Sequence, residues 1–238
     1  AHRTLDDSLL DIPVAVGGRS NVNIFSSKKE QREISTASGA FVSTILTNEG
    51  KKTFKEYFVD ENGKIRGIIT TSSYEARKYG VKTAMSVNEA LVLCPHLKML
   101  PPNYPLYHEL SIKLRDLLAK EVPLLEQFSI DEFFADVTGY IDESEIEEFA
   151  LYLKKKIFDE LKLPISIGIA NTKYLSKLIT EYAKPDGIKY VSAQNVESFI
   201  HDIPIREFPG IGKAFQERLK GYGIKTLGDI RKNQKLFY

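Results

Sequence analysis

Helical and strand-like patterns alternate between Leu106 and Val191, and this alternation constrains the fold more than any other feature of the chain. Apolar residues recur at helical spacing in three segments, and runs rich in Ile, Phe and Val separate them. The predicted order is a helix at 106–121, strand-like residues at 124–137, a helix at 145–163, a strand at 165–169, a helix at 171–183 and a strand at 188–191. Such an order predicts an α+β or α/β layer domain.

The N-terminal part of the chain has a different pattern, in which short strands alternate with turns. A β-meander is predicted at 40–71, and the Asn62-Gly63 pair within it suits a tight hairpin. Residues 94–105 contain four prolines and predict a connector. The expected elements are a strand at 12–18, a polar loop at 20–38, meander strands at 40–46, 52–59 and 65–71, and short helices at 72–80 and 87–93.

Composition excludes several classes of protein. The 238 residues suit one large domain or two modest ones. No run of about 18 apolar residues occurs, which excludes a transmembrane helix. A single cysteine, Cys94, excludes an intrachain disulfide and a cysteine zinc cluster, and it fits a reducing compartment.

The net charge of +1 conceals an uneven distribution. Residues 151–238 hold 16 Lys and Arg against 9 Asp and Glu, a balance of +7, and residues 1–150 hold 17 against 23, a balance of −6. A basic C-terminal part favours a polyanionic partner such as nucleic acid. The excess is moderate, however, and solvated helix faces explain it at least as well when charge is considered alone.

Two adjacent carboxylates, Asp131 and Glu132, interrupt a strongly apolar run. Burying unpaired carboxylates is costly, so either a turn exposes them or a cation pairs with them. Hard divalent cations such as Mg²⁺ bind carboxylate oxygens and keep waters or substrate phosphates as further ligands. Asp136 adds another acidic residue nearby in the sequence. The alternative is a hairpin whose turn happens to be Asp-Glu, and the motif alone leaves both interpretations open.

A tyrosine and two bases follow the last meander strand. Tyr74, Arg77 and Lys78 are spaced so that they share one face of a helical turn, next to Thr71. An Arg fork and a hydroxyl on one face can hold phosphate oxygens. The alternative is a Tyr–Arg stack on a solvated helix. Lys184 could likewise be an ordinary cation at the C-terminal end of a helix.

A glycine-rich turn, Pro209-Gly210-Ile211-Gly212-Lys213, precedes an amphipathic segment at 214–220. A Gly-x-Gly hairpin between short helices lets backbone N–H groups approach a phosphate without interference from a Cβ atom. The pattern matches helix-hairpin-helix DNA binding, which is independent of sequence because phosphate contacts position a duplex without reading it. A plain glycine turn is the alternative, and the helical flanks and Lys213 favour phosphate contact.

Taken together, these motifs resemble those of the Y-family, translesion DNA polymerases, nearest the DNA polymerase IV type. The resemblance covers most of the chain from Ile12 onward, and four motifs in the family's order are highly specific. The matching residues are Thr71–Val81, Ser129–Glu132, Ala183–Ile188 and Phe208–Gly212. The implied fold is an α+β right-hand polymerase with an α/β palm at 1–18 and 102–191, fingers at 19–101 carrying an inserted β-meander at about 19–66, and a small, incomplete helix-hairpin-helix thumb at 192–238.

The resemblance also implies a role for each motif. Asp131 would bind both of two catalytic Mg²⁺ ions, with Mn²⁺ as an alternative ion, and Glu132 would bind the ion at the primer end. The incoming triphosphate would be held by Thr71, Tyr74, Arg77 and Lys184. The nascent base pair would lie under a roof of Ile68, Thr70 and Ala84, where Ile68 is large for a very open roof. The hairpin residues Gly210, Ile211, Gly212 and Lys213 would grip the DNA backbone.

Three departures from the family pattern bear on activity. The family's opening strand carries a further metal-binding Asp and an aromatic that excludes ribonucleotides, and neither has a match here; Asp6, Asp7 and Asp11 do not take that role. The segment 19–66 replaces a short link and is expected to elaborate the fingers, ahead of the active site. The chain stops at Tyr238, inside the thumb, before the family's extra DNA-binding domain. The chain as given is therefore expected to be an incomplete, weakly active or inactive fragment.

The leading hypothesis is an enzyme: low-fidelity, template-directed DNA synthesis past damaged bases, with primer-template DNA and deoxynucleoside triphosphates as partners. The resemblance implies a cytoplasmic, nucleoid-associated monomer without membrane contact, recruited by a sliding clamp through a tail that is missing here. The alternative is a non-catalytic, polymerase-like accessory protein that grips DNA. A nucleotidyl cyclase with a similar palm is a third interpretation, but it has no need for the Gly210–Gly212 hairpin.

Overall fold

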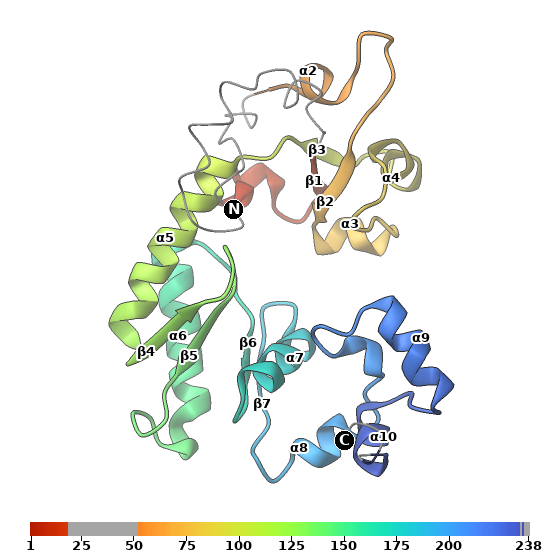
Figure 1. The fold of residues 1–238 in the computed structure, drawn as a ribbon. Helices are drawn as coiled ribbons and strands as arrows, with labels where there is room; N and C mark the ends of the chain where they lie inside the picture. Colours follow the sequence, from red (N-terminus) through yellow and green to blue (C-terminus); the bar gives the residue numbers. More distant parts are fainter. Residues whose placement is uncertain (19–51, 234, 236–238) are drawn as a thin grey trace, which may run out of the picture. The chain divides into compact units, whose positions relative to one another are not determined.

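The computed structural model describes residues 1–18, 52–233 and 235. The chain forms two compact units, Ala1–Ile112 and Lys113–Tyr238, and each is described here by itself (Figure 1). Among the described residues, no helix combines the length and apolar character that crossing a membrane requires.

A three-stranded sheet organises the first unit, in the order β2-β1-β3. The central strand β1 (Val14–Gly18) is buried over most of its length, as its apolar sequence predicts. It pairs antiparallel with β2 (Ile68–Ser72) and parallel with β3 (Lys98–Leu100). The strand β3 lies inside the predicted connector, so that interpretation of 94–105 is incomplete: only three residues between the prolines pair with β1.

Short helices pack around this sheet. The predicted helices at 72–80 and 87–93 are confirmed as α3 (Tyr74–Lys78) and α4 (Val87–Leu93), and each begins after a serine N-cap. The N-terminal residues form two 3-10 turns, η1 (His2–Thr4) and η2 (Asp7–Leu9). The buried core of this unit consists of Ala15, Tyr57, Phe58, Ile69, Ala76, Val81, Val87, Ala90, Cys94, Leu97 and Met99.

The predicted meander strand at 52–59 is wrong, because these residues form the helix α2 (Phe54–Phe58). Thr53 and Glu56 make a reciprocal capping box, in which the Thr53 amide donates to the Glu56 carboxylate at 2.7 Å. Helical spacing then lets Phe58 enter the core. The predicted strand at 40–46 lies outside the described residues, and a single antiparallel bridge joins Val59 to Ile65 across the Asn62-Gly63 turn.

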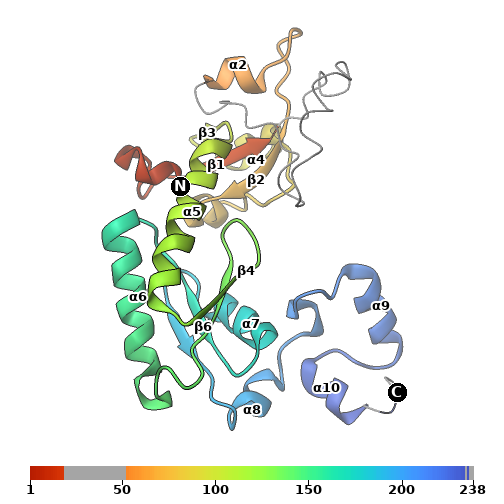
Figure 2. The ribbon, with the colours of Figure 1, turned by 60° about the vertical axis from the view of Figure 1, so that its left-hand side comes forward.

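The second unit confirms the predicted alternation of helices and strands. The helix α5 (Tyr104–Glu121) leads into it, followed by the antiparallel hairpin of β4 (Leu124–Gln127) and β5 (Phe133–Asp136). A 3-10 turn, η5 (Glu143–Glu145), precedes α6 (Ile146–Leu161). Then β6 (Ile167–Ile169) and β7 (Ile188–Tyr190) form a parallel pair connected by α7 (Lys173–Ala183). In Figure 2, α7 lies beside β6.

Short helices complete the second unit. They are α8 (Val196–Ile200), the 3-10 turn η6 (Ile205–Glu207), α9 (Lys213–Gly221) and α10 (Leu227–Lys232). Their apolar side chains share a core with Leu178 of α7, so this helical group is packed directly onto that helix. The buried members of this core are Leu178, Ile203, Ile205, Leu219, Ile224 and Leu227.

Candidate functional site

The predicted acidic pair lies in the turn that joins β4 to β5. We call residues Phe128–Glu132 the acidic turn. It is closed by the Phe128 amide, which donates to the Glu132 carbonyl at 2.9 Å. The Ser129 hydroxyl lies 3.0 Å from an Asp131 carboxylate oxygen and 3.4 Å from a Glu132 carboxylate oxygen. One hydroxyl is therefore within hydrogen-bond distance of both acidic side chains.

The hairpin interpretation of the apolar run is confirmed, and metal binding by the acidic pair stays a prediction. The Asp-Glu pair does form a hairpin turn, which leaves Asp131 exposed. The Lys177 side chain forms an ion pair with the Glu132 carboxylate. Asp136 lies at the other end of the hairpin, opposite Leu124, and is not part of the acidic turn. Hydrogen bonds from the Thr138 hydroxyl and amide lower the pKa of Asp136.

Two lysines of α7 face the hairpin in a repeated arrangement. Lys177 contacts Glu132, and its ammonium lies 4.8 Å from the centre of the Phe128 ring. One helical turn earlier, Lys173 contacts Glu126 of β4. The N-cap of α7 is Thr172, so the helix starts two residues later than the predicted range of 171–183. The β6-α7-β7 unit thus positions Lys173 next to Glu126 and Lys177 next to Glu132.

The acidic turn suits a hard divalent cation. Mg²⁺ is commonly held by one or two carboxylates together with substrate phosphates and water. Asp131 and Glu132 supply that number of carboxylates from an accessible turn. In the part of the chain that the structure describes, no group of three or more His, Cys, Asp or Glu residues lies together. A cation at this turn would therefore need further ligands from outside the described carboxylates, such as water or phosphate oxygens.

The tyrosine and arginine of α3 share a face, as the spacing predicts. The Arg77 guanidinium lies 5.0 Å from the centre of the Tyr74 ring, and its Nε donates to the Ser72 carbonyl at 3.1 Å. Tyr74 is 42% exposed and Arg77 is exposed as well. The stack that the sequence offered as an alternative is present, and it leaves the hydroxyl and part of the guanidinium accessible.

A β-bulge in β2 leaves two neighbouring residues, Thr70 and Thr71, at the surface. The register between β1 and β2 shifts beside Thr70, so Thr70 and Thr71 are both exposed although they are neighbours in a strand. Ile68 is 52% exposed. The Ala84 amide donates to the Ile69 carbonyl at 2.8 Å, which brings Ala84 next to this strand. The three predicted roof residues therefore lie close together.

Lys184 ends α7 in the second unit. Its ammonium lies 2.7 Å from the Glu181 carboxylate, and its side chain is 41% exposed. The residue is thus accessible, and an i,i+3 ion pair on the same helix holds it.

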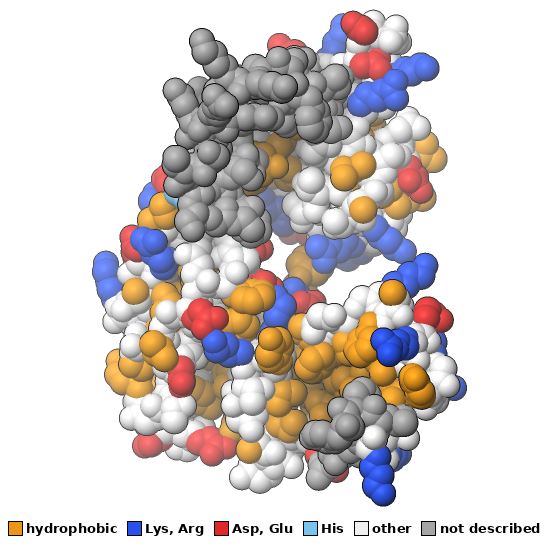
Figure 3. All heavy atoms as spheres, in the orientation of Figure 1, with side chains coloured by type: hydrophobic (Ala, Val, Ile, Leu, Met, Phe, Trp, Pro, Cys, Tyr) orange, Lys and Arg blue, Asp and Glu red, His pale blue; other side chains and the backbone are white. Residues whose placement is uncertain are grey.

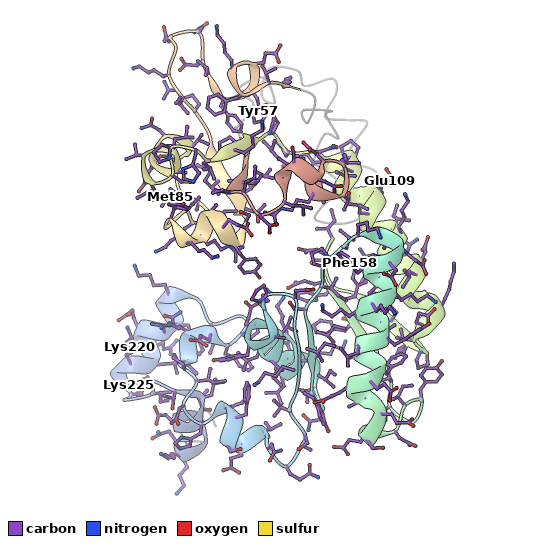
Figure 4. The ribbon with its side chains drawn as sticks, turned by 180° about the vertical axis from the view of Figure 1, so that it is seen from behind. Tyr57, Met85, Glu109, Phe158, Lys220 and Lys225 are labelled. Carbon is purple, nitrogen blue, oxygen red and sulfur yellow. The ribbon has the colours of Figure 1, made fainter. Side chains whose placement is uncertain are left out.

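The glycine-rich hairpin connects η6 to α9 with an open backbone. Gly210 has a φ of +92°, and Gly212 is the N-cap of α9, which starts at Lys213. A Cβ atom built at either glycine would meet nothing within 4 Å. Lys and Arg side chains are visible over α9 in Figure 3, and Figure 4 labels Lys220 and Lys225 in the same region. The hairpin therefore presents an exposed glycine backbone next to lysines of α9, while its Ile211 amide donates to the Phe208 carbonyl at 3.1 Å.

Comparison with known proteins identifies the family. The profile described as the impB/mucB/samB family matches residues 1–181. The chain belongs to the impB/mucB/samB family. The profile of the IMS family HHH motif matches residues 193–224, which include the glycine-rich hairpin. The acidic turn and α3 lie within the first match, so the predicted resemblance to Y-family polymerases is confirmed.

Relatives of this impB/mucB/samB chain are named DNA polymerase IV. That of Actinobacillus pleuropneumoniae serotype 3 is 38% identical over 173 residues, covering 72% of this chain and 49% of the relative. The DNA polymerase IV of Serratia proteamaculans is 40% identical over 167 residues, which cover 70% of this chain and 47% of the relative. The chain spans about half the length of the curated relatives it matches.

Solved structures resemble this impB/mucB/samB chain over almost its whole length. An insertion ternary complex of Dbh DNA polymerase matches with a TM-score of 0.75 and 27% identity, covering 97% of this chain and 56% of that chain. DinB from Sulfolobus solfataricus matches with a TM-score of 0.72 and 26% identity, covering the same shares. The predicted α+β polymerase fold is therefore confirmed.

Sequence reasoning did not single out Lys177 or Ser129 in this impB/mucB/samB chain. Ser129 lies inside the Ser129–Glu132 motif, and its spacing to Asp131 is the signal that could have pointed to it. Lys177 is 45 residues from Glu132, so no local pattern connects the two. Only the folded hairpin and α7 bring them together.

Proposed function

We propose that this chain contributes the palm, fingers and thumb of a Y-family DNA polymerase that synthesises DNA past damaged bases with low fidelity. The observation that carries the proposal is the pair of accessible carboxylates at the acidic turn, in the same compact unit as an open glycine-rich hairpin. The names of the relatives and of the matching structures support the same activity.

The acidic turn is the proposed metal site. Asp131 would ligate both of two Mg²⁺ ions and Glu132 the ion at the primer end. When bound, such ions activate the primer 3′-hydroxyl and stabilise the leaving pyrophosphate. The Ser129 hydroxyl restrains both carboxylates from the side of the turn. The hairpin of β4 and β5 fixes the position of the acidic turn, because the pair Gln127–Phe133 at the end of the strands flanks the turn directly.

The incoming triphosphate is the proposed ligand of Thr71, Tyr74, Arg77 and Lys184. Arg77 is held at its Nε by the Ser72 carbonyl, and this leaves its terminal amino groups free to bind phosphate oxygens. Thr71 is exposed beside the bulge, three residues before the start of α3. Ile68, Thr70 and Ala84 would then cover the nascent base pair.

The glycine-rich hairpin is the proposed DNA grip. The amides of Gly210 and Gly212 would donate to a backbone phosphate, with Lys213 nearby. The Ile211 amide instead donates to the Phe208 carbonyl at 3.1 Å and so holds the hairpin in shape. A non-catalytic accessory role is the second candidate. The ion pair between Lys177 and Glu132 favours it, because a paired carboxylate is less available to a metal.

Primer extension with Mg²⁺ and deoxynucleotides tests the proposal. The chain is assayed alone and as a chimera completed with the corresponding segments of the Actinobacillus DNA polymerase IV, because it spans about half of that relative. The chimera should extend the primer, and an Asp131→Ala, Glu132→Ala variant should lose at least about a hundredfold in rate. The matched control Asp136→Asn, at the other end of the hairpin, should retain activity. DNA binding without extension by the chimera would favour the accessory role.

A further inference from the structure

The Lys177 ammonium occupies the carboxylate that the proposed metal site needs. It contacts Oε1 of Glu132, while the Ser129 hydroxyl lies 3.4 Å from Oε2. Both ends of the ion pair are partly accessible, with exposed fractions of 26% for Lys177 and 43% for Glu132. The Phe128 ring lies under the ammonium at 4.8 Å. The two oxygens of Glu132 therefore already have partners before any cation binds.

A divalent cation at Oε1 would meet this ammonium at close range. Two positive groups on one carboxylate oxygen repel, so one must leave. We infer that Lys177 is a positioning residue that serves as the resident counter-ion of Glu132 and competes with the divalent cation for it. The inference rests on the metal role proposed for Glu132. This competition raises the concentration of divalent cation that is needed to fill the proposed site.

A place for the displaced ammonium exists in the same unit. Lys177 lines a groove together with Arg206, the hairpin residues Phe208–Gly212 and two carboxylates, those of Glu181 and Glu207. An ammonium released from Glu132 would add positive charge to this groove, beside the amides proposed to hold a DNA phosphate. Cation binding at the acidic turn and phosphate binding in the groove would then favour each other, because both favour the state in which the Lys177 ammonium has left Glu132.

Lys173 provides a control within the same helix. It also pairs with a hairpin carboxylate, that of Glu126, and its ammonium also lies over an aromatic ring, Phe134, at 5.9 Å. Glu126 is in β4 and outside the acidic turn. Lys173→Gln therefore removes the same charge from the same helix without freeing Glu132.

The test is a titration of the isotope-labelled chain with Mn²⁺, followed by paramagnetic broadening of the amide signals of Ser129, Asp131 and Glu132. We expect Lys177→Gln to reach half-broadening at about two- to fivefold lower Mn²⁺ than the unaltered chain, the range for losing a partly exposed ion pair. Lys173→Gln should change the midpoint by much less. Signals remote from the turn report whether each variant keeps its fold.

The possible results separate this inference from the proposed function. Equal midpoints for the unaltered chain and Lys177→Gln would overturn the competition and leave the metal role standing. An equal shift of the Mn²⁺ midpoint in both lysine variants would mean that the loss of any nearby positive charge has this effect. That result would also overturn the competition between Lys177 and the cation. Absence of broadening at the turn in every folded variant would refute the metal role and the competition together.

Discussion

The Tyr182 hydroxyl donates a 2.5 Å hydrogen bond to the Glu207 carboxylate and so ties α7 to the 3-10 turn that leads into the glycine-rich hairpin. Nearby, the Tyr174 ring stacks on Phe208 with ring centres 6.3 Å apart, and Leu178 is buried in the core of the helical group. The same helix carries the lysine that meets the acidic turn. One helix thus connects both proposed working parts of the second unit.

Tyr182→Phe should weaken this connection by about 1 kcal/mol at pH 8, since it removes a charge-assisted hydrogen bond from a partly exposed site. Burial and the hydrogen bond to Glu207 raise the pKa of Tyr182 from its usual 10 to about 12. A raised pKa means that the folded state favours the protonated hydroxyl. The contribution is therefore complete below pH 10 and lost as the pH rises through about 12.

Urea unfolding of the two proteins between pH 8 and pH 12 checks this expectation. The difference in unfolding free energy should be steady up to about pH 10 and shrink above it. Tyr222→Phe, at a tyrosine that is 57% exposed, is the matched control and should change stability little. A difference that is equal at all pH values would show that Tyr182 does not titrate against Glu207.

Arg3→Gln should make the first unit less stable at neutral pH. The Arg3 guanidinium lies 2.8 Å from the Glu75 carboxylate, at the start of α3. Burial raises the pKa of Glu75, but hydrogen bonds from Ser73 and Arg3 outweigh it and bring the pKa down to about 2. The stabilisation is thus fully present above about pH 4.5 and lost as the pH falls through about 2. We expect a loss of about 1 kcal/mol after allowing for solvent screening.

A carbon-detected NMR titration of Glu75 measures the pKa directly. In Arg3→Gln it should move up toward 4.5 without reaching it, because the Ser73 hydrogen bond remains. Glu75→Gln keeps the shape of the side chain but cannot titrate, so its stability should vary less with pH between 2 and 4.5. An unmoved pKa in Arg3→Gln would assign the shift to the hydrogen bonds from Ser73 and from the Glu75 backbone amide.

The helix α4 was predictable because its Ser86 cap agrees with the helical pattern, whereas α6 has no side-chain N-cap and was predictable from its apolar periodicity alone. The strand prediction for residues 52–59 failed. Their aromatic side chains favour a strand, but the Thr53–Glu56 capping box favours a helix and decides the structure. The strand β3 was missed because three residues carry too little pattern to read, and its partner lies more than 80 residues away. Local signals therefore predicted the long elements better than the short ones.

The candidate site divides in the same way. Tyr74 and Arg77 were predictable as neighbours because helical spacing alone puts them on one face. The bulge at Thr70 was not, since it depends on how β2 meets Gly17 of the opposite strand. The counter-ion of Glu132 is likewise a product of tertiary structure. The sequence was therefore enough to propose which residue types form the site. The bulge and the ion pair of Glu132 depend on contacts between distant segments, which local sequence patterns do not reveal.

Gly168→Ala should destabilise the second unit by about 3 kcal/mol, because β6 and α7 are in close contact at this residue. A Cβ atom there would lie 2.3 Å from the Ser176 carbonyl oxygen and 2.4 Å from the Thr180 amide nitrogen. Both are backbone atoms of α7, so relief requires moving the helix. Urea unfolding measures the loss. Gly221→Ala, where a Cβ atom meets nothing within 4 Å, should stay within about 1 kcal/mol of the unaltered chain.

Two glycines of the hairpin should separate folding from DNA binding. Gly210 has a φ of +92°, so Gly210→Ala should cost about 1–2 kcal/mol of stability from backbone strain. Gly212 has a φ of −78°, which alanine adopts readily, and its surroundings are open, so Gly212→Ala should fold with nearly unchanged stability. Its methyl group would nevertheless stand where a phosphate approaches the amides, and we expect about tenfold weaker binding of duplex DNA.

Fluorescence anisotropy with a labelled duplex at several salt concentrations decides the matter. Lys213→Gln should weaken binding and reduce the slope of log affinity against log salt by about one, the effect of losing one phosphate contact. Gly212→Ala should weaken binding with a smaller change in slope, because it removes no charge. Unchanged affinity in a folded Gly212→Ala variant would mean that DNA does not approach the hairpin backbone, and the grip would then have to be assigned to lysine side chains alone.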